Sequence, residues 1–362
     1  MLIEFDDSCI EIFNRNLKYK TFFNKLAYEV FEENNYYYFS KKMLEYLYKN
    51  EILGKEPREI YKRLFDLSFE DNLIKNSVNR KLKIVANTNF IDEIKFSNEE
   101  YIMELDKLIE IGIPDKIQLI AENYSDCRFY NHIGNAYKTK ENIKNVKIKL
   151  DQVNAGGSTI YLEYTAKINE KKISILFVDT DKKYKNDKKG ETLRKLLNER
   201  IILKRENNFK EYIEIKILDI HEVENLIPIS MMKRMFYGKN VLNQKKETFD
   251  FFEKCINGNE EQIEALSFFD LKNGIVLAKL SNESYKKYWK TIIENVGEIF
   301  DENNLLKGIK RDLLNECLHY LENNIEKENF WNENIDKYLE SRWNEIGQSI
   351  YSYGCARVKK VC

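Results

Sequence analysis

Six acidic residues follow three apolar runs of the sequence at the point where each run ends. One acid comes directly after "IQLIA" and another lies one helical turn later, two end the run "ISILFVDTD", and two follow "YIEIKILDI". The six acids are Glu122, Asp126, Asp179, Asp181, Glu222 and Glu224. If the three runs are strands of one parallel sheet, the acids gather at the edge where the strands end, which is where such sheets carry their chemistry.

Carboxylates that are crowded at one edge indicate a site for a divalent cation. Like charges a few ångströms apart raise one another's pKa and destabilise the fold, and a cation removes that repulsion. A site made of carboxylates and water suits Mg²⁺ or Mn²⁺ better than zinc or copper. Such an ion can polarise a phosphodiester, generate hydroxide and stabilise the leaving oxygen. The alternative is that the acids are strand-end caps and surface charges.

A dense run of basic residues follows the second pair of acids. The stretch "DKKYKNDKKGETLRKLLNERIILKR" carries far more Lys and Arg than Asp and Glu. Its first five lysines are Lys182, Lys183, Lys185, Lys188 and Lys189. A polyanion needs a basic margin of this kind to approach an acidic centre, and so these five are the predicted nucleic-acid contacts. A solvated helix face is the alternative interpretation of the same run.

Strands and helices alternate between residues 115 and 228. The predicted strands are "KIQLIAEN", "NVKIKLDQV", "ISILFVD" and "YIEIKILDI". A helix capped by Ser125 follows the first strand, and a helix entered through Gly156 and Gly157 follows the second. The third predicted helix has the apolar stripe Leu193, Leu196, Leu197 and Ile201. This alternation predicts an α/β fold with a parallel four-stranded sheet and crossover helices.

The regions on both sides of the predicted sheet have mainly helical spacing. In residues 1–113, the segment "SKKMLEYLYKNEILGKEPREIYKRLF" predicts two helices joined at Gly54, with Pro57 near the start of the second. Two such helices could read DNA, although plain packing is the commoner reason for this pattern. Residues 230–362 return to the helical period, and we expect their tryptophans to be core anchors. The predicted division is therefore 1–113 (helical), 114–229 (catalytic sheet) and 230–362 (helical).

Composition limits the class of protein. The chain has 362 residues, 33% of them charged, and a formal net charge of −1, so contact with nucleic acid requires a local basic patch. Six cysteines without a CxxC pair indicate neither a disulfide framework nor a zinc ribbon. The start of the sequence is unlike a signal peptide, and no uncharged apolar stretch approaches the ~20 residues that span a bilayer. We therefore expect a cytoplasmic protein that does not enter the membrane.

The order of the acidic motifs resembles the Toprim domain, a metal-binding domain shared by topoisomerases, bacterial primases and OLD-type nucleases. "LIAENYSDCRFY" is similar to the nuclease form of the first motif, although Asn123 stands where a Gly often follows the first Glu. "LFVDTD" is similar to the DxD motif. "HEVENLIP" resembles the Glu-Asn segment of OLD-like members, which favours Glu224 over Glu222 as the ligand of the third motif.

The resemblance covers residues 115–228 and implies Mg²⁺ or Mn²⁺ as the cofactor. The implied metal ligands are Glu122, Asp126, Asp179, Asp181 and Glu224, with Glu222 as a further catalytic candidate. The chain lacks the zinc-ribbon spacing that precedes the domain in primases, and its flanks are short for a topoisomerase. It also lacks the GxxxxGK[ST] motif of the ATPase that full-length OLD proteins carry. In its stand-alone form it resembles the Toprim effectors of multi-gene anti-phage defence systems, in which a separate ATPase senses infection.

Three further residues have a possible role beside the acids. His221 could serve as a proton shuttle or contact phosphate, and a loop histidine without such a role is the alternative. Lys233 and Arg234 lie just past the third motif and could neutralise charge that develops in phosphoryl chemistry.

The leading hypothesis is a metal-dependent endonuclease that hydrolyses DNA or tRNA and acts as the toxic effector of an abortive-infection system. We expect a partner ATPase to control it, through apolar surface on the helical flanks, with a homodimer as the rival use of that surface. The alternative is a Toprim-fold module that mainly binds or regulates a partner and has little nuclease activity.

Overall fold

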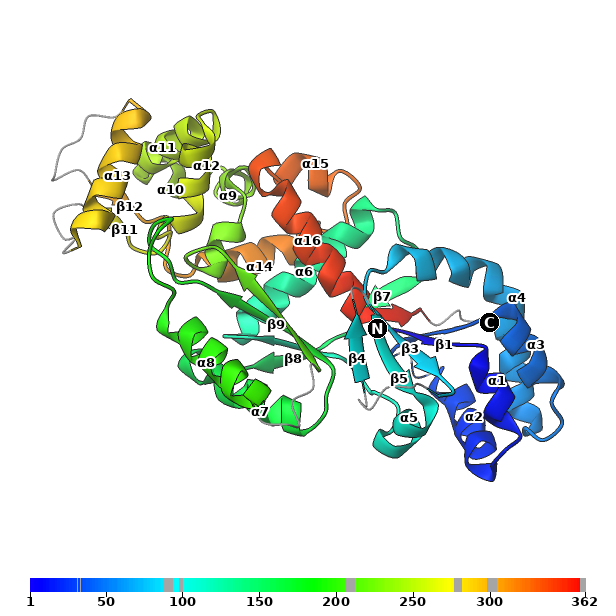
Figure 1. Ribbon diagram of the computed structural model, residues 1–362. Helices are drawn as coiled ribbons and strands as arrows, with labels where there is room; N and C mark the ends of the chain where they lie inside the picture. Colours follow the sequence, from blue (N-terminus) through cyan, green and yellow to red (C-terminus); the bar gives the residue numbers. More distant parts are fainter. Residues whose placement is uncertain are drawn as a thin grey trace.

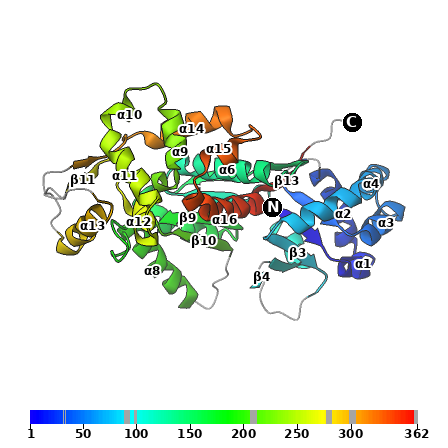
Figure 2. The ribbon, with the colours of Figure 1, turned by 90° about the horizontal axis from the view of Figure 1, so that it is seen from above.

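The structure, a computed structural model, describes residues 1–30, 32, 34–87, 94–97, 100–205, 212–276, 282–297 and 305–358. Three parts follow one another along an elongated molecule (Figure 1). An N-terminal α/β region lies at one end, a central sheet lies in the middle, and a mainly helical region lies at the other end. Figure 2 shows the same order from above.

The central sheet has four strands, and each strand is parallel to its neighbour. Its order is β10-β9-β6-β8. The strands are β6 (Gln118–Ala121), β8 (Asp151–Asn154), β9 (Ser174–Asp179) and β10 (Ile213–Leu218). Strand β9 lies between two neighbours and is buried along nearly its whole length, as expected of a parallel strand covered on both faces. The predicted α/β class with a parallel four-stranded sheet is confirmed.

Crossover helices cover both faces of this sheet (Figure 1). Helix α6 (Tyr124–Lys140) lies on one face, and α7 (Ile160–Asn169) and α8 (Glu191–Arg205) lie on the other. Asn123, not Ser125, is the N-cap of α6, so the predicted cap is wrong by two residues. The predicted strand "NVKIKLDQV" divides into β8 and a separate short strand, β7 (Val146–Ile148), which pairs with β13 (Cys355–Arg357).

The N-terminal region contains a five-stranded sheet that its helical spacing did not predict. The order of this sheet is β2-β1-β3-β5-β4. Its strands are β1 (Leu2–Phe5), β2 (Tyr36–Phe39), β3 (Lys81–Val85), β4 (Ile94–Ser97) and β5 (Glu100–Glu104). Strands β1 and β2 have four residues each and are buried throughout, and runs this short cannot be told from a helix by periodicity.

The helices of the N-terminal region agree better with the sequence-based prediction than its strands do. They are α1 (Ser8–Phe13), α2 (Leu17–Glu29), α3 (Lys41–Lys49), α4 (Lys55–Ser77) and α5 (Leu105–Ile111). Gly54 joins α3 to α4 as the N-cap residue of α4, as predicted.

The C-terminal region is mainly helical, as expected. Its helices are α9 (Ile229–Met235), α10 (Val241–Gln244), α11 (Lys246–Ile256), α12 (Glu260–Ala265), α13 (Glu283–Asn295), α14 (Leu313–Asn324), α15 (Phe330–Asn334) and α16 (Lys337–Gly354). Two short antiparallel strands, β11 (Gly274–Val276) and β12 (Leu305–Lys307), lie among them. The predicted core anchors are buried, since Trp289, Trp331 and Trp343 are at most 7% exposed.

Helix α16 returns from the C-terminal region to the central sheet and packs against α6 (Figure 1). Glycines permit this close approach. A Cβ added at Gly134 of α6 would lie 2.3 Å from Ile350 Cγ2, and one added at Gly347 of α16 would lie 2.5 Å from Tyr137 Cβ. In space, α16 therefore belongs to the layer that covers the central sheet, although it lies far beyond residue 229. None of the described helices combines the length and apolar character needed to cross a bilayer.

Candidate functional site

Glu122 lies directly after β6, at the carboxyl edge of the central sheet. The backbone N–H groups of Gly156 and Gly157 donate to its carbonyl oxygen at 3.1 and 3.2 Å. Both glycines have positive φ (70° and 59°), a conformation that favours Gly, and they lead into a 3₁₀ turn and then α7. The predicted helix-entry turn therefore also fixes the backbone of Glu122.

Asp179 is the last residue of β9, and Asp181 lies two residues further on. Thr180 donates to the Ile220 carbonyl oxygen after β10, from its backbone N–H at 3.2 Å and its Oγ1 at 2.9 Å. Asp181 has φ 52°, a left-handed conformation that Asp adopts more readily than most residues. Gly190 leaves room for it, because a Cβ there would lie 2.1 Å from Asp181 Oδ2.

Glu122, Asp179 and Asp181 come together at the carboxyl ends of β6 and β9. Each offers one carboxylate oxygen, and these oxygens lie within 4.8 Å of one another. Glu122 Oε1 and Asp179 Oδ1 are buried and have no hydrogen-bond partner within the described ranges. We call these three residues the acidic triad.

The triad has the strained electrostatics expected of crowded, buried carboxylates. Burial raises the pKa of Asp179 to about 9, and the neighbouring charges of Glu122 and Asp181 add to this effect. Burial also raises the pKa of Glu122 to about 7, with Asp181 as the next cause. The pKa of Asp181 is raised by burial as well. Without a cation, the triad therefore retains protons that separate carboxylates would release below pH 7.

Asp126 lies one turn into α6, next to the triad but not within it. Its Oδ2 accepts the backbone N–H of Asn123 at 3.0 Å, so it caps the helix that follows Glu122. Burial raises the pKa of Asp126 to about 6. Asn123 has extended backbone (φ −132°), and the Gly that is often found at this place would not be needed here. Asp126 thus has a structural role beside any role in cation binding.

Glu222 and Glu224 lie after β10 around a short 3₁₀ turn, Val223–Leu226, and share a counter-charge that the sequence did not predict. Lys272 Nζ lies 3.0 Å from Glu222 Oε2 and 3.0 Å from Glu224 Oε1. Glu224 is only 3% exposed, and burial raises its pKa although Lys272 opposes the shift. The charge of Lys272 also opposes the rise in the pKa of Glu122 and Asp126, as expected of an ammonium group near the acidic edge.

The acidic triad fits a hard divalent cation. Three carboxylate oxygens at short mutual distance, two of them on side chains with an unpartnered buried oxygen, form the all-oxygen donor set that Mg²⁺ and Mn²⁺ accept. Asp126 and Glu224 border the triad and each has one partner within the protein, while Glu224 Oε2 is also buried without a hydrogen-bond partner among the described residues.

The predicted lysines lie on a loop that is fixed to the C-terminal region. Trp289 Nε1 donates to the Lys183 carbonyl oxygen at 3.0 Å, and Tyr184 stacks on Tyr285 with ring centroids 5.9 Å apart. Lys182 pairs with Asp219 at 2.8 Å and Lys185 with Glu264 at 2.6 Å. Within the described ranges, Lys183, Lys188 and Lys189 are exposed and form no ion pair, although the charge of Lys183 opposes the rise in the pKa of Asp181. These three are the lysines that remain available to a polyanion.

Lys233 and Arg234 have partners away from the acidic triad. Lys233 pairs with Glu253 of α11, and Arg234 lies 3.4 Å from Glu333 of α15. The structure places both in ion pairs between helices of the C-terminal region and does not bring them to the triad.

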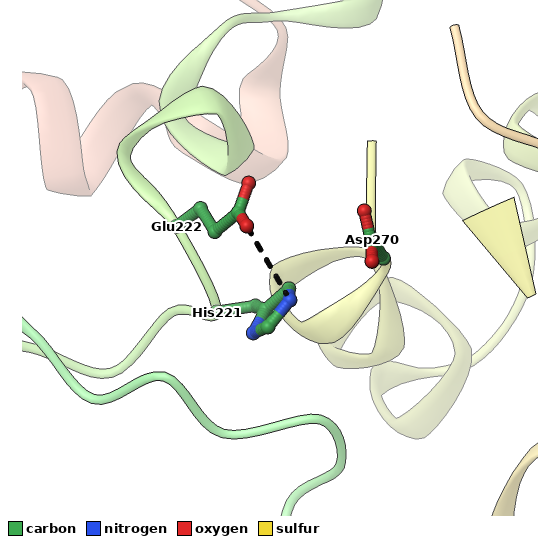
Figure 3. A group of neighbouring side chains, drawn as sticks. All are labelled: His221, Glu222 and Asp270. Atoms are coloured by element: carbon green, nitrogen blue, oxygen red, sulfur yellow. Dashed lines mark ion pairs between the residues drawn. The ribbon is translucent and has the colours of Figure 1, made fainter. Parts of the chain in front are cut away.

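A second cluster, formed by His221, Glu222 and Asp270, lies beside the same edge (Figure 3). The sequence pointed to His221 and Glu222 but missed Asp270 and Lys272. Both missed residues follow the 3₁₀ turn Leu266–Phe268, where the segment "FFDLKNG" has no motif that would single them out. Only the folded contact between this segment and the end of β10 makes them part of the site.

Comparison with known proteins gives one partial similarity. The chain is 28% identical over 310 residues to a protein named DNA mismatch repair protein MutS from Clostridium botulinum (strain Eklund 17B / Type B). The similarity covers 81% of this chain and 29% of that protein, so this chain spans less than a third of the length of its curated relative. No protein-family model matches the chain, and no solved structure gives a significant match.

Proposed function

We propose that this protein is a divalent-cation-dependent nuclease of the Toprim type, similar to OLD-like nucleases, which hydrolyses phosphodiester bonds of DNA or tRNA. The observation that carries the proposal is the acidic triad, with its unpartnered buried oxygens, at the carboxyl edge of a parallel sheet. The name of the partial relative refers to DNA mismatch repair, and this supports a nucleic-acid substrate.

The residues have distinct tasks in this proposal. Glu122, Asp179 and Asp181 hold Mg²⁺ or Mn²⁺, which supplies Lewis-acid polarisation of the phosphodiester and an activated water. Asp126 fixes the start of α6 behind Glu122, and Lys272 supplies the counter-charge of Glu222 and Glu224 beside the triad. Lys183, Lys188 and Lys189 attract the phosphate backbone towards that edge.

The test is incubation of the purified chain with plasmid DNA and with total tRNA. Each substrate is combined with Mg²⁺, with Mn²⁺ and with chelator. We expect cleavage of at least one substrate with a metal ion and none with chelator. Cleavage that is equal with and without chelator would contradict a cation-dependent mechanism.

Replacing Lys183, Lys188 and Lys189 together by Gln should weaken binding of duplex DNA and flatten its salt dependence. Each lost phosphate contact lowers the slope of log K against log[salt] by roughly 0.9, so the triple variant should lose up to about 2.7. Fluorescence anisotropy of labelled DNA at several salt concentrations measures the slope. The matched control is Lys182→Gln with Lys185→Gln, whose side chains pair with acids. An unchanged slope in the triple variant would show that these lysines belong to a solvated surface and do not contact DNA.

A second candidate function is a partner-binding module with little nuclease activity. The contacts of Lys272 and Asp126 favour it, because these residues already satisfy part of the acidic edge without a metal ion. Thermal denaturation with added Mg²⁺ or Mn²⁺ separates the two functions. A nuclease gains stability of RT ln(1 + [L]/Kd) from its cation, whereas a module without a cation site gains none.

We further propose that the nuclease is a toxic effector of an anti-phage system and that a partner ATPase controls it. The N-terminal region offers a docking surface on α4, where Phe69 is 80% exposed and Leu73, one turn later, is 63% exposed. A second copy of the chain is the rival occupant of this surface. Expression of the chain alone in cells should cause little toxicity. Strong toxicity that disappears in an Asp179→Asn variant would show an active nuclease without a partner and would contradict control by an ATPase.

A further inference from the structure

His221, Glu222 and Asp270 form a cluster that binds no metal ion in the cleavage proposed above. His221 and Glu222 follow β10, and Asp270 lies beyond the 3₁₀ turn Leu266–Phe268. One ligand atom of each residue lies within 4.8 Å of the other two. Figure 3 shows the Glu222 side chain pointing towards the imidazole, with Asp270 beside them on the second segment.

Buried hydrogen bonds fix the two segments relative to each other. The His221 backbone N–H donates to the Ser267 carbonyl oxygen at 2.8 Å. Asn225 Nδ2 donates to the carbonyl oxygens of Leu266 and Phe269, each at 2.9 Å. The cluster is therefore held by the backbone of both segments and does not depend on the rotamers of long surface side chains.

The imidazole of His221 is the independent sign that the cluster accepts a ligand. His221 is 7% exposed, and its Nδ1 is buried without a hydrogen-bond partner in the described part of the chain. Its Nε2 points to Glu222 Oε1, but at 3.7 Å the two atoms are too far apart for a hydrogen bond. A buried imidazole without a hydrogen bond is costly, and a metal ion on Nε2 would remove part of that cost.

Both carboxylates keep an oxygen for such an ion. Glu222 turns Oε2 to Lys272 and leaves Oε1 facing the imidazole. Asp270 Oδ1 accepts the backbone N–H groups of Lys272 (3.0 Å) and Asn273 (2.7 Å), while Oδ2 accepts only the Asn273 amide at 3.1 Å. The ammonium of Lys272 is shared by Glu222 and Glu224, and Asp270 forms no ion pair among the described residues, so the negative charge of the cluster is only partly balanced.

We propose that His221, Glu222 and Asp270 form a second cation site, distinct from the acidic triad and selective for a different class of metal. One imidazole and two carboxylates give a mixed nitrogen and oxygen donor set. Such a set binds Zn²⁺ more tightly than Mn²⁺ and binds Mg²⁺ poorly, whereas the all-oxygen triad accepts Mg²⁺. The proposal concerns metal binding alone and does not depend on nuclease activity.

Calorimetric titration of the full chain, stripped with chelator, tests this assignment. Zn²⁺ and Mg²⁺ are titrated separately into the wild type, His221→Gln and Asp179→Asn. We expect His221→Gln to weaken Zn²⁺ binding by more than about tenfold and to leave Mg²⁺ binding unchanged. Removing a residue that only hydrogen-bonds to a metal ligand already costs about tenfold in affinity, so removing a ligand should cost more. Asp179→Asn should instead weaken Mg²⁺ binding and leave Zn²⁺ binding unchanged. Equal Zn²⁺ affinity in the wild type and His221→Gln would overturn the assignment.

Two measurements keep the test decisive if His221→Gln is unstable. Asp270→Asn retains an oxygen that can accept the backbone N–H groups of the turn, and it should also lose Zn²⁺ affinity. In addition, electron spin-echo spectroscopy of bound Mn²⁺ should show coupling to an imidazole nitrogen in the wild type. Absence of this coupling at saturating Mn²⁺, or its presence in a folded His221→Gln variant, would contradict ligation by His221.

Discussion

Asp179→Asn should reduce Mn²⁺-dependent cleavage of nucleic acid by at least about 100-fold. Asn has nearly the same shape as Asp, but it lacks the charge that a cation requires at the end of β9. Asp179 is central to the triad, since the charges of Glu122 and Asp181 are the main effects on its pKa after burial. Initial rates on the best substrate of the wild type measure the loss.

The matched control for this variant is Asp250→Asn. Asp250 lies on α11, where it pairs with Lys246 at 2.9 Å across one helical turn, and it should leave the rate unchanged. A wild-type rate in folded Asp179→Asn would remove the triad from catalysis, even if the protein cleaves nucleic acid.

Asp179→Asn should be more stable than the wild type when no metal ion is present, and the difference in the free energy of unfolding should grow as pH rises. The pKa of Asp179 is raised from 3.8 to about 9 in the folded protein, so folding takes up a proton between these values. The stability that depends on this proton is complete below about pH 4 and is lost as pH rises through 9. Urea denaturation in chelator at pH 5, 7 and 9 should therefore show a flatter profile for Asp179→Asn. Parallel profiles would show that burial and the neighbouring carboxylates do not raise the pKa of Asp179 in the folded protein.

Lys272→Met should destabilise the metal-free protein by about 2–4 kcal/mol. Removing one partner of a buried ion pair costs roughly 3–5 kcal/mol, and the partial exposure of Lys272 and Glu222 reduces this cost. Glu224, at 3% exposure, would keep a charge without its counter-ion. Urea denaturation in chelator measures the loss. Added Mn²⁺ should then stabilise Lys272→Met more than the wild type, because a divalent cation replaces the missing ammonium group.

Two controls separate this effect from a general loss of a lysine. Lys239→Met removes a lysine that is 52% exposed and pairs with Glu316, and it should change stability by less than about 1 kcal/mol. Lys272→Met combined with Glu224→Gln should recover most of the stability, since the buried charge is then absent. A loss of equal size in the single and double variants would show that Lys272 acts by packing and not by charge.

The strands that carry the triad could be predicted from the sequence because they are buried on both faces. The runs before Glu122 and Asp179 are apolar except for Gln118 and Ser174 and end in acids, so both the strands and the position of their carboxyl ends could be predicted. The left-handed backbone conformation of Asp181 and the space that Gly190 leaves for its side chain could not be predicted from the sequence, since they depend on a contact between the two ends of a loop.

The elements that the sequence missed depend on long-range contacts. Strand β1 pairs with β2 and β3, from residues 36–39 and 81–85, and its four residues are too few to show a period that would distinguish a strand from a helix. Lys272 reaches Glu222 and Glu224 from a segment of the C-terminal region that is some fifty residues away along the chain. The acids could therefore be predicted from the sequence, whereas their internal counter-charge could not.

Anomalous diffraction from crystals soaked in Mn²⁺ tests the cation site of the triad most directly. We predict a peak at ligand distance from carboxylate oxygens of Glu122, Asp179 and Asp181, which already lie within 4.8 Å of one another. The peak should be absent from crystals of Asp179→Asn. A Mn²⁺ peak elsewhere, with none at these three residues at saturating metal, would contradict the site on which the proposed nuclease activity depends.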